Sequence, residues 1–314
     1  MAVVDVLVEG VASFPAGGET VFVRGVTMVP GGDAVNQSVA LAALGHPVGL
    51  MTVVGDDQQG SLISNWCRDQ GVDVSGVTVT RDYPTTTSIG IIDDSGERSF
   101  LSPRGGTAAE YGPEHANLDY LRPGLKVLSV ASLFCSRSLD LELLLPLLRR
   151  AKDLGAITVA DLVANRADGT LDELSAAFKY LDYIVPSQAE AEVFAGTKDP
   201  VDAAKAFRQH GIDNVVIKLG RDGSYALTPS GSLHVPAFDV PAVDTTGAGD
   251  NFVAGLISGL VLGLPLGEAL RRASATAALS VQAVGATTGV RQAGGLDSPK
   301  SLPVGCPGIE YPAR

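Results

Sequence analysis

The sequence predicts an α/β fold, with a doubly wound, mostly parallel sheet and helices on both of its faces. Short runs rich in Val and Ile alternate with helical segments along most of the 314 residues. These runs are apolar on both faces, which is typical of buried parallel strands. A glycine is the residue that most often follows a helix C-terminus, and four of the helical segments are followed by one, at Gly45, Gly71, Gly155 and Gly211.

The alternation gives the order of the predicted elements. We expect strands at residues 48–55, 127–132, 157–163, 183–186 and 214–220. We expect helices between and after them, at residues 34–44, 61–70, 139–154, 171–181, 201–210 and 266–284. A further long apolar helix begins near Gly249.

Two regions depart from the alternation of strands and helices. In residues 19–29 polar and apolar residues alternate, as in an edge strand, and residues 85–101 predict a hairpin around the turn sequence Asp93-Asp-Ser-Gly96. Together they predict a small antiparallel sheet, from about residues 14–30 and 85–104, that projects from a main domain at residues 1–290. Residues 291–314 are rich in Gly and Pro and predict an irregular tail.

The composition excludes several classes of protein. With 45% hydrophobic and 18% charged residues the chain is globular, and its net charge of −12 argues against nucleic-acid and polybasic membrane-surface binding. Cys67, Cys135 and Cys306 are scattered, which argues against a disulfide framework or zinc site. The apolar stretches are too short for a membrane span, so we expect a cytoplasmic protein.

The motif with the most chemical content is Asp244-Thr-Thr-Gly-Ala-Gly-Asp250, at the start of the long apolar helix. Its glycines let backbone N–H groups approach an anion, and a helix N-terminus favours negative charge. Asp250 lies at the same helix start. An aspartate there is common for capping alone, but N–H groups beside a carboxylate are also what phosphoryl transfer to a hydroxyl requires.

A second motif is Gly31-Gly-Asp-Ala-Val-Asn36, followed by small residues up to Leu44-Gly45. Gly31 and Gly32 allow a polar ligand to approach the backbone closely. Asn36 offers both donors and acceptors, which suits the diol of a sugar. Taken alone, the motif is also compatible with a glycine turn before an ordinary helix.

Both motifs resemble the two signatures of the ribokinase-like carbohydrate kinases, the PfkB family, and the resemblance covers about residues 5–290. The stretches Gly-Gly-Asp-Ala and Val-Gly-Ala-Thr-Thr-Gly-Val are most similar to bacterial sugar kinases of unassigned substrate in this family. The resemblance implies a three-layer α/β/α sandwich with a mostly parallel central sheet and a small β-sheet lid. It also implies ATP and Mg²⁺ as cofactors, a sugar substrate, and a homodimer formed through the lid.

The resemblance also assigns roles to residues. Asp250 would be the catalytic base, and the backbone of Gly247, Ala248 and Gly249 the anion hole. Asp244 would either hold a loop or help to coordinate a monovalent cation such as K⁺. Substrate contacts are expected from Asp5, Gly31, Gly32 and Asn36, and nucleotide contacts from Lys218, Gly220, Gly223, Gly285 and Ala286. By position alone, Arg104 after the lid and Asp161 at a strand end are further candidate substrate contacts.

The sequence departs from the family at two places. The family usually has Asn-x-x-Glu where this chain has Ser187-Gln-Ala-Glu190, with the Glu bound to Mg²⁺ through water. In the family a strand and a glycine precede the substrate aspartate, whereas only four residues precede Asp5. Either the sequence begins after that strand, or residues 3–8 are the strand and the substrate aspartate is absent; we adopt the first interpretation.

We therefore expect an ATP-dependent sugar kinase. Two alternatives stay open: a nucleoside kinase of the same fold, for which Tyr83 and Phe100 would supply an aromatic clamp, and a non-catalytic relative that binds a sugar or nucleotide. A P-loop NTPase is excluded, because the chain has no Gly-x-x-x-x-Gly-Lys-[Ser/Thr].

Overall fold

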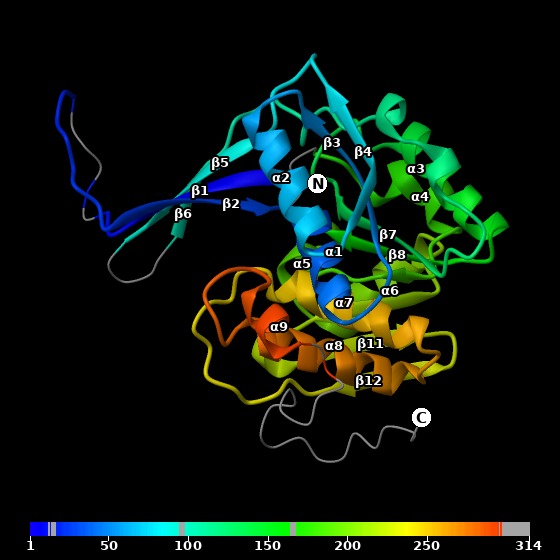
Figure 1. The fold of residues 1–314 in the computed structure, drawn as a ribbon. Coiled ribbons are helices and arrows are strands. Elements are labelled where there is room, and N and C mark those ends of the chain that lie inside the picture. Colours follow the sequence, from blue (N-terminus) through cyan, green and yellow to red (C-terminus); the bar gives the residue numbers. More distant parts are fainter. Residues whose placement is uncertain (12, 14–16, 94–97, 164–167, 295, 297–314) are drawn as a thin grey trace.

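The computed structural model describes residues 1–11, 13, 17–93, 98–163, 168–294 and 296. A layered α/β body carries a long, narrow sheet that projects from one side of it (Figure 1). This arrangement confirms the predicted combination of a central sheet and a smaller separate sheet.

The largest sheet has six strands in the order β12-β11-β10-β9-β8-β7. Strands β7 to β10 are parallel, while β11 and β12 continue the sheet in antiparallel pairs. Their bounds are β7 Val127–Leu133, β8 Ile157–Leu162, β9 Tyr183–Ile184, β10 Asn214–Lys218, β11 Ser224–Thr228 and β12 Gly231–Val235. The predicted mostly parallel sheet is thus confirmed, whereas β12 was not predicted from the sequence.

Strand β3 (Gly49–Gly55) does not join this sheet. Among the described strands its one partner is β4 (Asp73–Thr80), in parallel, and the two form a sheet of their own. The prediction of a strand at residues 48–55 is confirmed, but its expected place in one continuous sheet is not.

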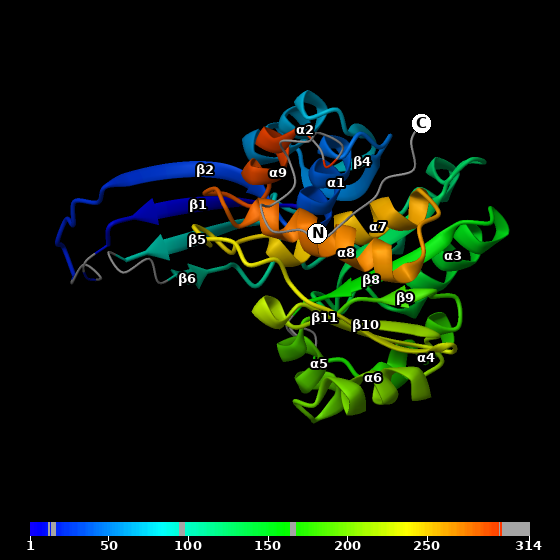
Figure 2. The same cartoon turned by 90° about the horizontal axis from the view of Figure 1, so that it is seen from below.

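Helices cover both faces of the six-stranded sheet (Figure 2). Helices α3 to α6 lie on one face, and α1, α7 and α8 lie on the other. Successive side chains of β10 point to opposite faces: Val215 and Ile217 pack into the core on the α3 side, and Val216 packs into the core on the α7 side. The helices are α1 Asp33–Ala43, α2 Gln58–Asp69, α3 Leu141–Asp153, α4 Leu171–Phe178, α5 Gln188–Ala195, α6 Pro200–Gln209, α7 Ala248–Val261, α8 Leu266–Ser280 and α9 Thr288–Ala293, with 3₁₀ turns at Pro113–His115, Leu118–Tyr120 and Gly220–Asp222.

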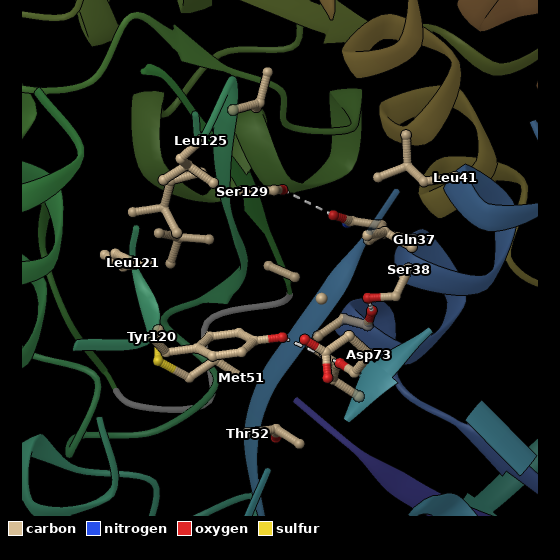
Figure 3. A pocket seen from close by; sticks show the side chains of 18 of the residues that line it. Gln37, Ser38, Leu41, Met51, Thr52, Asp73, Tyr120, Leu121, Leu125 and Ser129 are labelled. Carbon is tan, nitrogen blue, oxygen red and sulfur yellow. Dashed lines mark hydrogen bonds between the residues drawn. The ribbon is translucent and has the colours of Figure 1, made fainter. Parts of the chain in front are cut away.

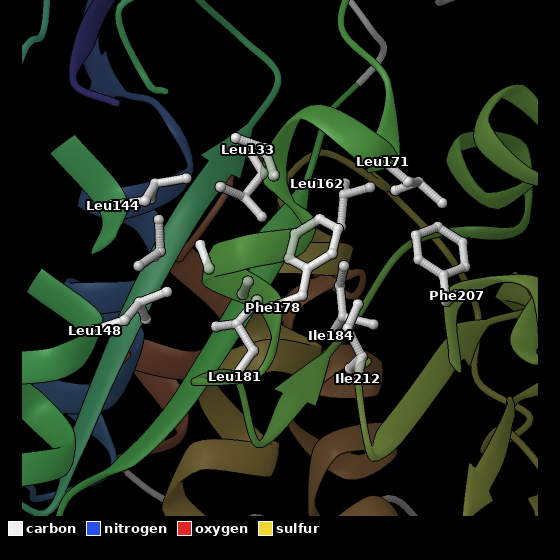
Figure 4. Packing of buried hydrophobic residues seen from close by; sticks show 14 of the residues in the cluster. Leu133, Leu144, Leu148, Leu162, Leu171, Phe178, Leu181, Ile184, Phe207 and Ile212 are labelled. Carbon is white, nitrogen blue, oxygen red and sulfur yellow. The ribbon is translucent and has the colours of Figure 1, made fainter. Parts of the chain in front are cut away.

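Helix α3 illustrates how the sequence builds this core. The side chain of Asp140 caps the helix by accepting hydrogen bonds from the N–H groups of Glu142 and Leu143. Leucines spaced three and four residues apart form one apolar stripe, and they pack against Phe178 and Ile184 (Figure 4). The helical stripe therefore fixes which face of the sheet α3 covers.

The projecting sheet, called the lid below, has four strands in the order β2-β1-β5-β6. They are β1 Val3–Glu9, β2 Gly25–Gly31, β5 Thr87–Ile92 and β6 Arg98–Leu101. The predicted hairpin is confirmed as the antiparallel pair β5–β6, although its turn at 94–96 lies outside the described residues. Because β1 pairs with β2 and β5, residues 3–8 are not a strand of the central sheet.

At the C-terminal end, α9 covers Thr288–Ala293 and so extends into the segment predicted to be irregular; residues 295 and 297–314 lie outside the described part. Within the described residues, no helix is long and apolar enough to cross a membrane.

Candidate active site

The candidate site lies where the carboxyl ends of β8 and β10 meet the first turns of α1 and α7. Open parallel sheets bind their ligands at this edge. Asp161 is the penultimate residue of β8 and Lys218 the last residue of β10, so the strands themselves position both side chains.

The first turn of α7 presents free backbone donors. Gly247 precedes the helix in a left-handed conformation (φ 72°), and the N–H of Ala248 donates to Thr245 O at 3.2 Å. The N–H groups of Gly249 and Asp250 donate to no backbone carbonyl in the described part of the chain. These two donors at a helix N-terminus are available to an anion.

The carboxylate of Asp250 is buried and held by side chains of α1. Asn36 Nδ2 donates to its Oδ2 at 2.8 Å, and Gln37 Nε2 lies 3.4 Å from its Oδ1. Burial, followed by the nearby charges of Asp33 and Asp161, raises the pKa of Asp250 well above its usual range. The site therefore contains a carboxylate that holds a proton more tightly than an exposed aspartate does.

Asp161 and Lys218 form a buried ion pair next to Asp250. Lys218 Nζ lies 2.7 Å from Asp161 Oδ1. Burial raises the pKa of Asp161 to about 7, because desolvation and the charge of Glu190 outweigh the opposing effect of Lys218. Burial lowers the pKa of Lys218, but Asp161 and Glu190 overcome this and raise it, so the side chain stays a cation.

The ammonium group of Lys218 also lies beside the free donors of α7. A Cβ atom placed on Gly249 would be only 3.3 Å from Lys218 Nζ. A cation and two free N–H groups therefore converge at one point, next to the carboxylate of Asp250. This combination fits a phosphate group and a hydroxyl that attacks it.

Four of the residues predicted to bind the sugar lie around the first turn of α1. A Cβ on Gly31 would be 2.5 Å from Asp5 Oδ2, so a larger residue here would displace this carboxylate. Burial and the charge of Asp33 raise the pKa of Asp5 to about 6. Gly32 has φ 95° and lies against the backbone of Met1. Asp5, Gly31, Gly32 and Asn36 thus lie at the same end of α1 as the Asp250 carboxylate.

The loops predicted to contact the nucleotide flank α7. Gly220 and Gly223 form the turn from β10 to β11, and Gly223 has φ 90° with no space for a side chain beside Val235 O. Ala286 packs on Gly247, and its carbonyl accepts a hydrogen bond from Asn251 Nδ2 at 2.6 Å. The 285–286 loop is therefore fixed to the start of α7.

Asp244 ties this loop to the motif. Its Oδ1 accepts from Thr246 N–H at 2.9 Å and its Oδ2 from Gly285 N–H at 2.8 Å. The sequence left two roles open for Asp244, to hold a loop or to coordinate a monovalent cation, and these two hydrogen bonds favour the first.

Glu190 lies beside the ion pair, at the start of α5. Its Oε2 accepts the N–H of Ser187 at 2.6 Å, and Ser187 Oγ accepts the N–H of Glu190 at 3.3 Å. Ser187 forms a parallel bridge with Lys218, which places the carboxylate close to the ammonium. Arg104, in contrast, is exposed after β6 and is not part of this cluster.

Comparison with known proteins identifies the fold and its chemistry. A family model described as pfkB family carbohydrate kinase matches residues 3–293. The chain belongs to this family. It is 29% identical to a ribokinase of Haemophilus influenzae, covering 90% of this chain and 91% of that protein, and 31% identical to an aminoimidazole riboside kinase of Salmonella typhimurium, covering 82% and 84%. The ribokinase of Arabidopsis thaliana, solved with ribose and ATP, superposes with a TM-score of 0.80 at 25% identity over 92% of both chains.

Three polar residues at the site of this pfkB kinase were not predicted from the sequence: Asp33, Gln37 and Ser129. Gln37 Nε2 lies 3.3 Å from Asp161 Oδ2, and its Oε1 accepts from Ser129 Oγ at 3.0 Å, so it joins both carboxylates to β7. Asp33 accepts a hydrogen bond from Ser132 and raises the pKa of both Asp5 and Asp250. The consecutive polar residues 36–38 in an otherwise apolar helix were a signal for Gln37; nothing in the sequence marked Ser129.

Proposed function

We propose that the protein transfers the γ-phosphoryl group of ATP to a hydroxyl of a monosaccharide or sugar derivative. One observation carries this proposal: the Asp250 carboxylate lies next to two free N–H groups of α7 and the ammonium of Lys218. A non-catalytic binder has no need of a carboxylate at an anion site.

Asp250 acts as the general base. Its carboxylate accepts the proton of the substrate hydroxyl while the oxygen attacks phosphorus, and Asn36 fixes its orientation through the 2.8 Å hydrogen bond. The raised pKa supports this role, because a base works best when its pKa lies near the working pH.

The chain offers preorganised hydrogen-bond donors and one ammonium group to the transferred group. The N–H groups of Gly249 and Asp250 donate to its oxygens, and Lys218 balances the charge that develops there. The turn containing Gly247 and Ala248 sets the direction of these donors. When bound, Mg²⁺ neutralises the phosphate oxygens of ATP, and Glu190 is the residue we propose to hold it through water.

The two substrates meet at the first turn of α7. Asp5 and Asn36 hold hydroxyls of the sugar, and Gly31 and Gly32 leave the space it requires. The backbone at Gly220, Gly223, Gly285 and Ala286 lines the nucleotide side. Arg104 lies exposed on the segment after the lid, and we assign it no contact with either substrate.

We also propose that the protein is a homodimer of the reducing cytoplasm, joined through the lid. The lid strands expose Val26 and Met28 on β2 and Phe100 and Leu101 on β6, each at 47% or more of its surface. Exposed apolar edge strands invite pairing, and a symmetric contact would cover them.

A riboside is the second candidate acceptor. The 31% identity to the Salmonella aminoimidazole riboside kinase supports it, and Phe100 on the lid could stack on a base. The acceptor panel below separates the two.

The first experiment measures ADP release with Mg·ATP across ketoses, aldoses, sugar phosphates and ribosides. We expect turnover with one class, and a loss of at least about 10²-fold in kcat for Asp250→Asn. Asp153→Asn, an exposed aspartate of α3, is the matched control and should leave turnover unchanged. A folded protein that binds ATP but turns over none of these acceptors, or an active Asp250→Asn variant, would contradict the proposal.

A further inference from the structure

Three carboxylates from three different elements lie around the acceptor end of the proposed site. Asp5 belongs to β1, Asp33 is the first residue of α1, and Asp250 lies in the first turn of α7. The start of α1 brings them together, because the Asp5 carboxylate lies against Gly31 and Asn36 donates to Asp250. An acceptor bound here therefore meets three acidic side chains.

Two of these carboxylates are held by neutral groups. The hydroxyl of Ser132, at the end of β7, donates to Asp33, and the amide of Asn36 donates to Asp250 at 2.8 Å. Ser132 is fully buried and has φ 67°, a conformation that residues other than glycine rarely adopt. A hydroxyl or an amide orients a carboxylate without adding positive charge, so both negative charges remain.

Gln37 is a third neutral donor at the site. Its Nε2 lies 3.4 Å from Asp250 Oδ1 and 3.3 Å from Asp161 Oδ2. Its Oε1 accepts a hydrogen bond from Ser129 Oγ at 3.0 Å, which directs the amide nitrogen toward the two carboxylates (Figure 3). Gln37 thus orients the acidic groups and adds no positive charge.

The Asp5 carboxylate is the group left for a ligand. It is half-buried, and no described residue donates a hydrogen bond to it. Burial, followed by the charge of Asp33, raises the pKa of Asp5 to about 6, so the group is mostly ionised near neutral pH. A half-buried carboxylate without a partner is satisfied by donors such as sugar hydroxyls, whereas a second anion would add repulsion.

The positive charge of the site lies on the phosphoryl side. The ammonium of Lys218 is bonded to Asp161 at 2.7 Å and lies beside Gly249 in the first turn of α7. It acts on the pKa of Asp250 and not on that of Asp5. In the described part of the chain, no lysine or arginine forms an ion pair with Asp5 or Asp33. The acceptor end therefore has a negative potential.

We propose that the acceptor of this kinase carries no negative charge: it is an uncharged sugar, and Asp5 and Asp33 exclude sugar phosphates and sugar acids. This selectivity rests on the proposed function, because that function assigns Asp5 to the acceptor. A phosphate group carries about two negative charges near pH 7, and it would meet two carboxylates with no cation between them. Specificity of this kind comes from repulsion of the wrong ligand.

The test uses matched sets of acceptors. They are ribose, fructose and glucose, the phosphate of each at either end of its carbon chain, and gluconate. The O-methyl derivative at each phosphorylated position controls for size. ADP release gives kcat/KM for each acceptor, and the shift in Tm caused by each acceptor without ATP gives binding that needs no turnover.

In the set that turns over, we expect the uncharged sugar to exceed its phosphates by at least about 10²-fold in kcat/KM, and the O-methyl derivatives to be discriminated less. Asp33→Asn should narrow this ratio by at least about tenfold, while Asp153→Asn, an exposed site on α3, leaves it unchanged. The ratio is taken within one variant, so an effect of Asp33→Asn on Asp250 cancels. Tm shifts should rank the acceptors in the same order.

The outcomes separate this selectivity from the kinase activity. A sugar phosphate or sugar acid as the best acceptor, or an unchanged ratio in Asp33→Asn, overturns the selectivity and leaves the kinase in place. Absence of ADP release with every acceptor contradicts the kinase instead, and the Tm shifts then still rank uncharged against anionic sugars. A protein whose Tm responds to none of these acceptors, and which releases no ADP, would overturn both.

Discussion

Lys218 Nζ lies 2.7 Å from Asp161 Oδ1, and the two largely buried side chains come from the carboxyl ends of β10 and β8, which β9 separates in the sheet. This ammonium lies among the carboxylates of Asp161, Glu190 and Asp250. Negative charge is therefore in excess at the site before any phosphate arrives. The excess is one reason, after burial, that Asp161 and Asp250 hold their protons more tightly than usual.

Replacing the lysine should damage both stability and turnover. Lys218→Met leaves Asp161 buried without its partner, which should cost about 3–5 kcal/mol in the free energy of unfolding. Turnover should fall by at least about 10²-fold, because the transferred group loses its nearest cation. Urea unfolding and steady-state kinetics measure the two effects.

A double variant separates them. Asp161→Asn combined with Lys218→Met removes the charge that the single variant leaves unpaired at Asp161, so much of the stability should return while turnover stays low. If the double variant recovers turnover along with stability, Lys218 serves the fold and not the phosphoryl transfer.

The pH profile should depend on Asp33. Asp250 must be ionised to accept a proton, so kcat/KM falls as the pH drops through the pKa of Asp250. Because the charge of Asp33 raises that pKa, Asp33→Asn should move the acidic limb to lower pH. The exposed Asp153→Asn variant should leave the limb in place. A limb that stays fixed in Asp33→Asn would show that another group controls it.

Gly247 should tolerate alanine poorly. It has φ 72°, and an added Cβ would lie 2.7 Å from the Cβ of Ala286. Gly263 has φ 70° but nothing within 4 Å of an added Cβ, so Gly263→Ala measures the backbone strain alone, about 1–2 kcal/mol. Gly247→Ala should lose at least about 1 kcal/mol more and raise the KM for ATP, since the 285–286 loop must move. Equal losses in the two variants would contradict this.

The lid should control the oligomeric state. Phe100→Glu places a charge on an exposed edge strand and should convert a dimer to a monomer in sedimentation velocity. Leu262→Glu, at the exposed end of α7 and 53% exposed in the native chain, should have no effect. A wild-type protein that is monomeric at all concentrations would exclude the proposed dimer.

Periodicity and glycine placement were enough to predict most of the body. Helices such as α3 follow from one leucine stripe and a following glycine, and the hairpin β5–β6 from its turn sequence. Strand β12 was harder, because its residues are exposed up to Val235 and give no apolar pattern. The separation of β3 from the main sheet is a tertiary property, and no local pattern encodes it.

The site was predictable where residues are consecutive and not where they converge. The motif around Asp250 and the pair Gly31–Gly32 could be found by spacing. The contacts of Gln37 with Ser129, and of Lys218 with Asp161, join positions 92 and 57 residues apart in the chain. Such contacts depend on the register of two strands and a helix, which a single sequence does not specify.

Strand β1 has one end in the body and the other in the lid. Asp5, near its inner end, lies against Gly31 at the inner end of β2, while the outer residues of both strands reach away from the body (Figure 2). A strand is stiff along its length, so tilting the outer part turns the inner part about the same pivot. If Asp5 binds the sugar and a partner subunit holds the outer part of the lid, as we propose, then a tilt of the outer part would move the Asp5 carboxylate and change how tightly the sugar is held.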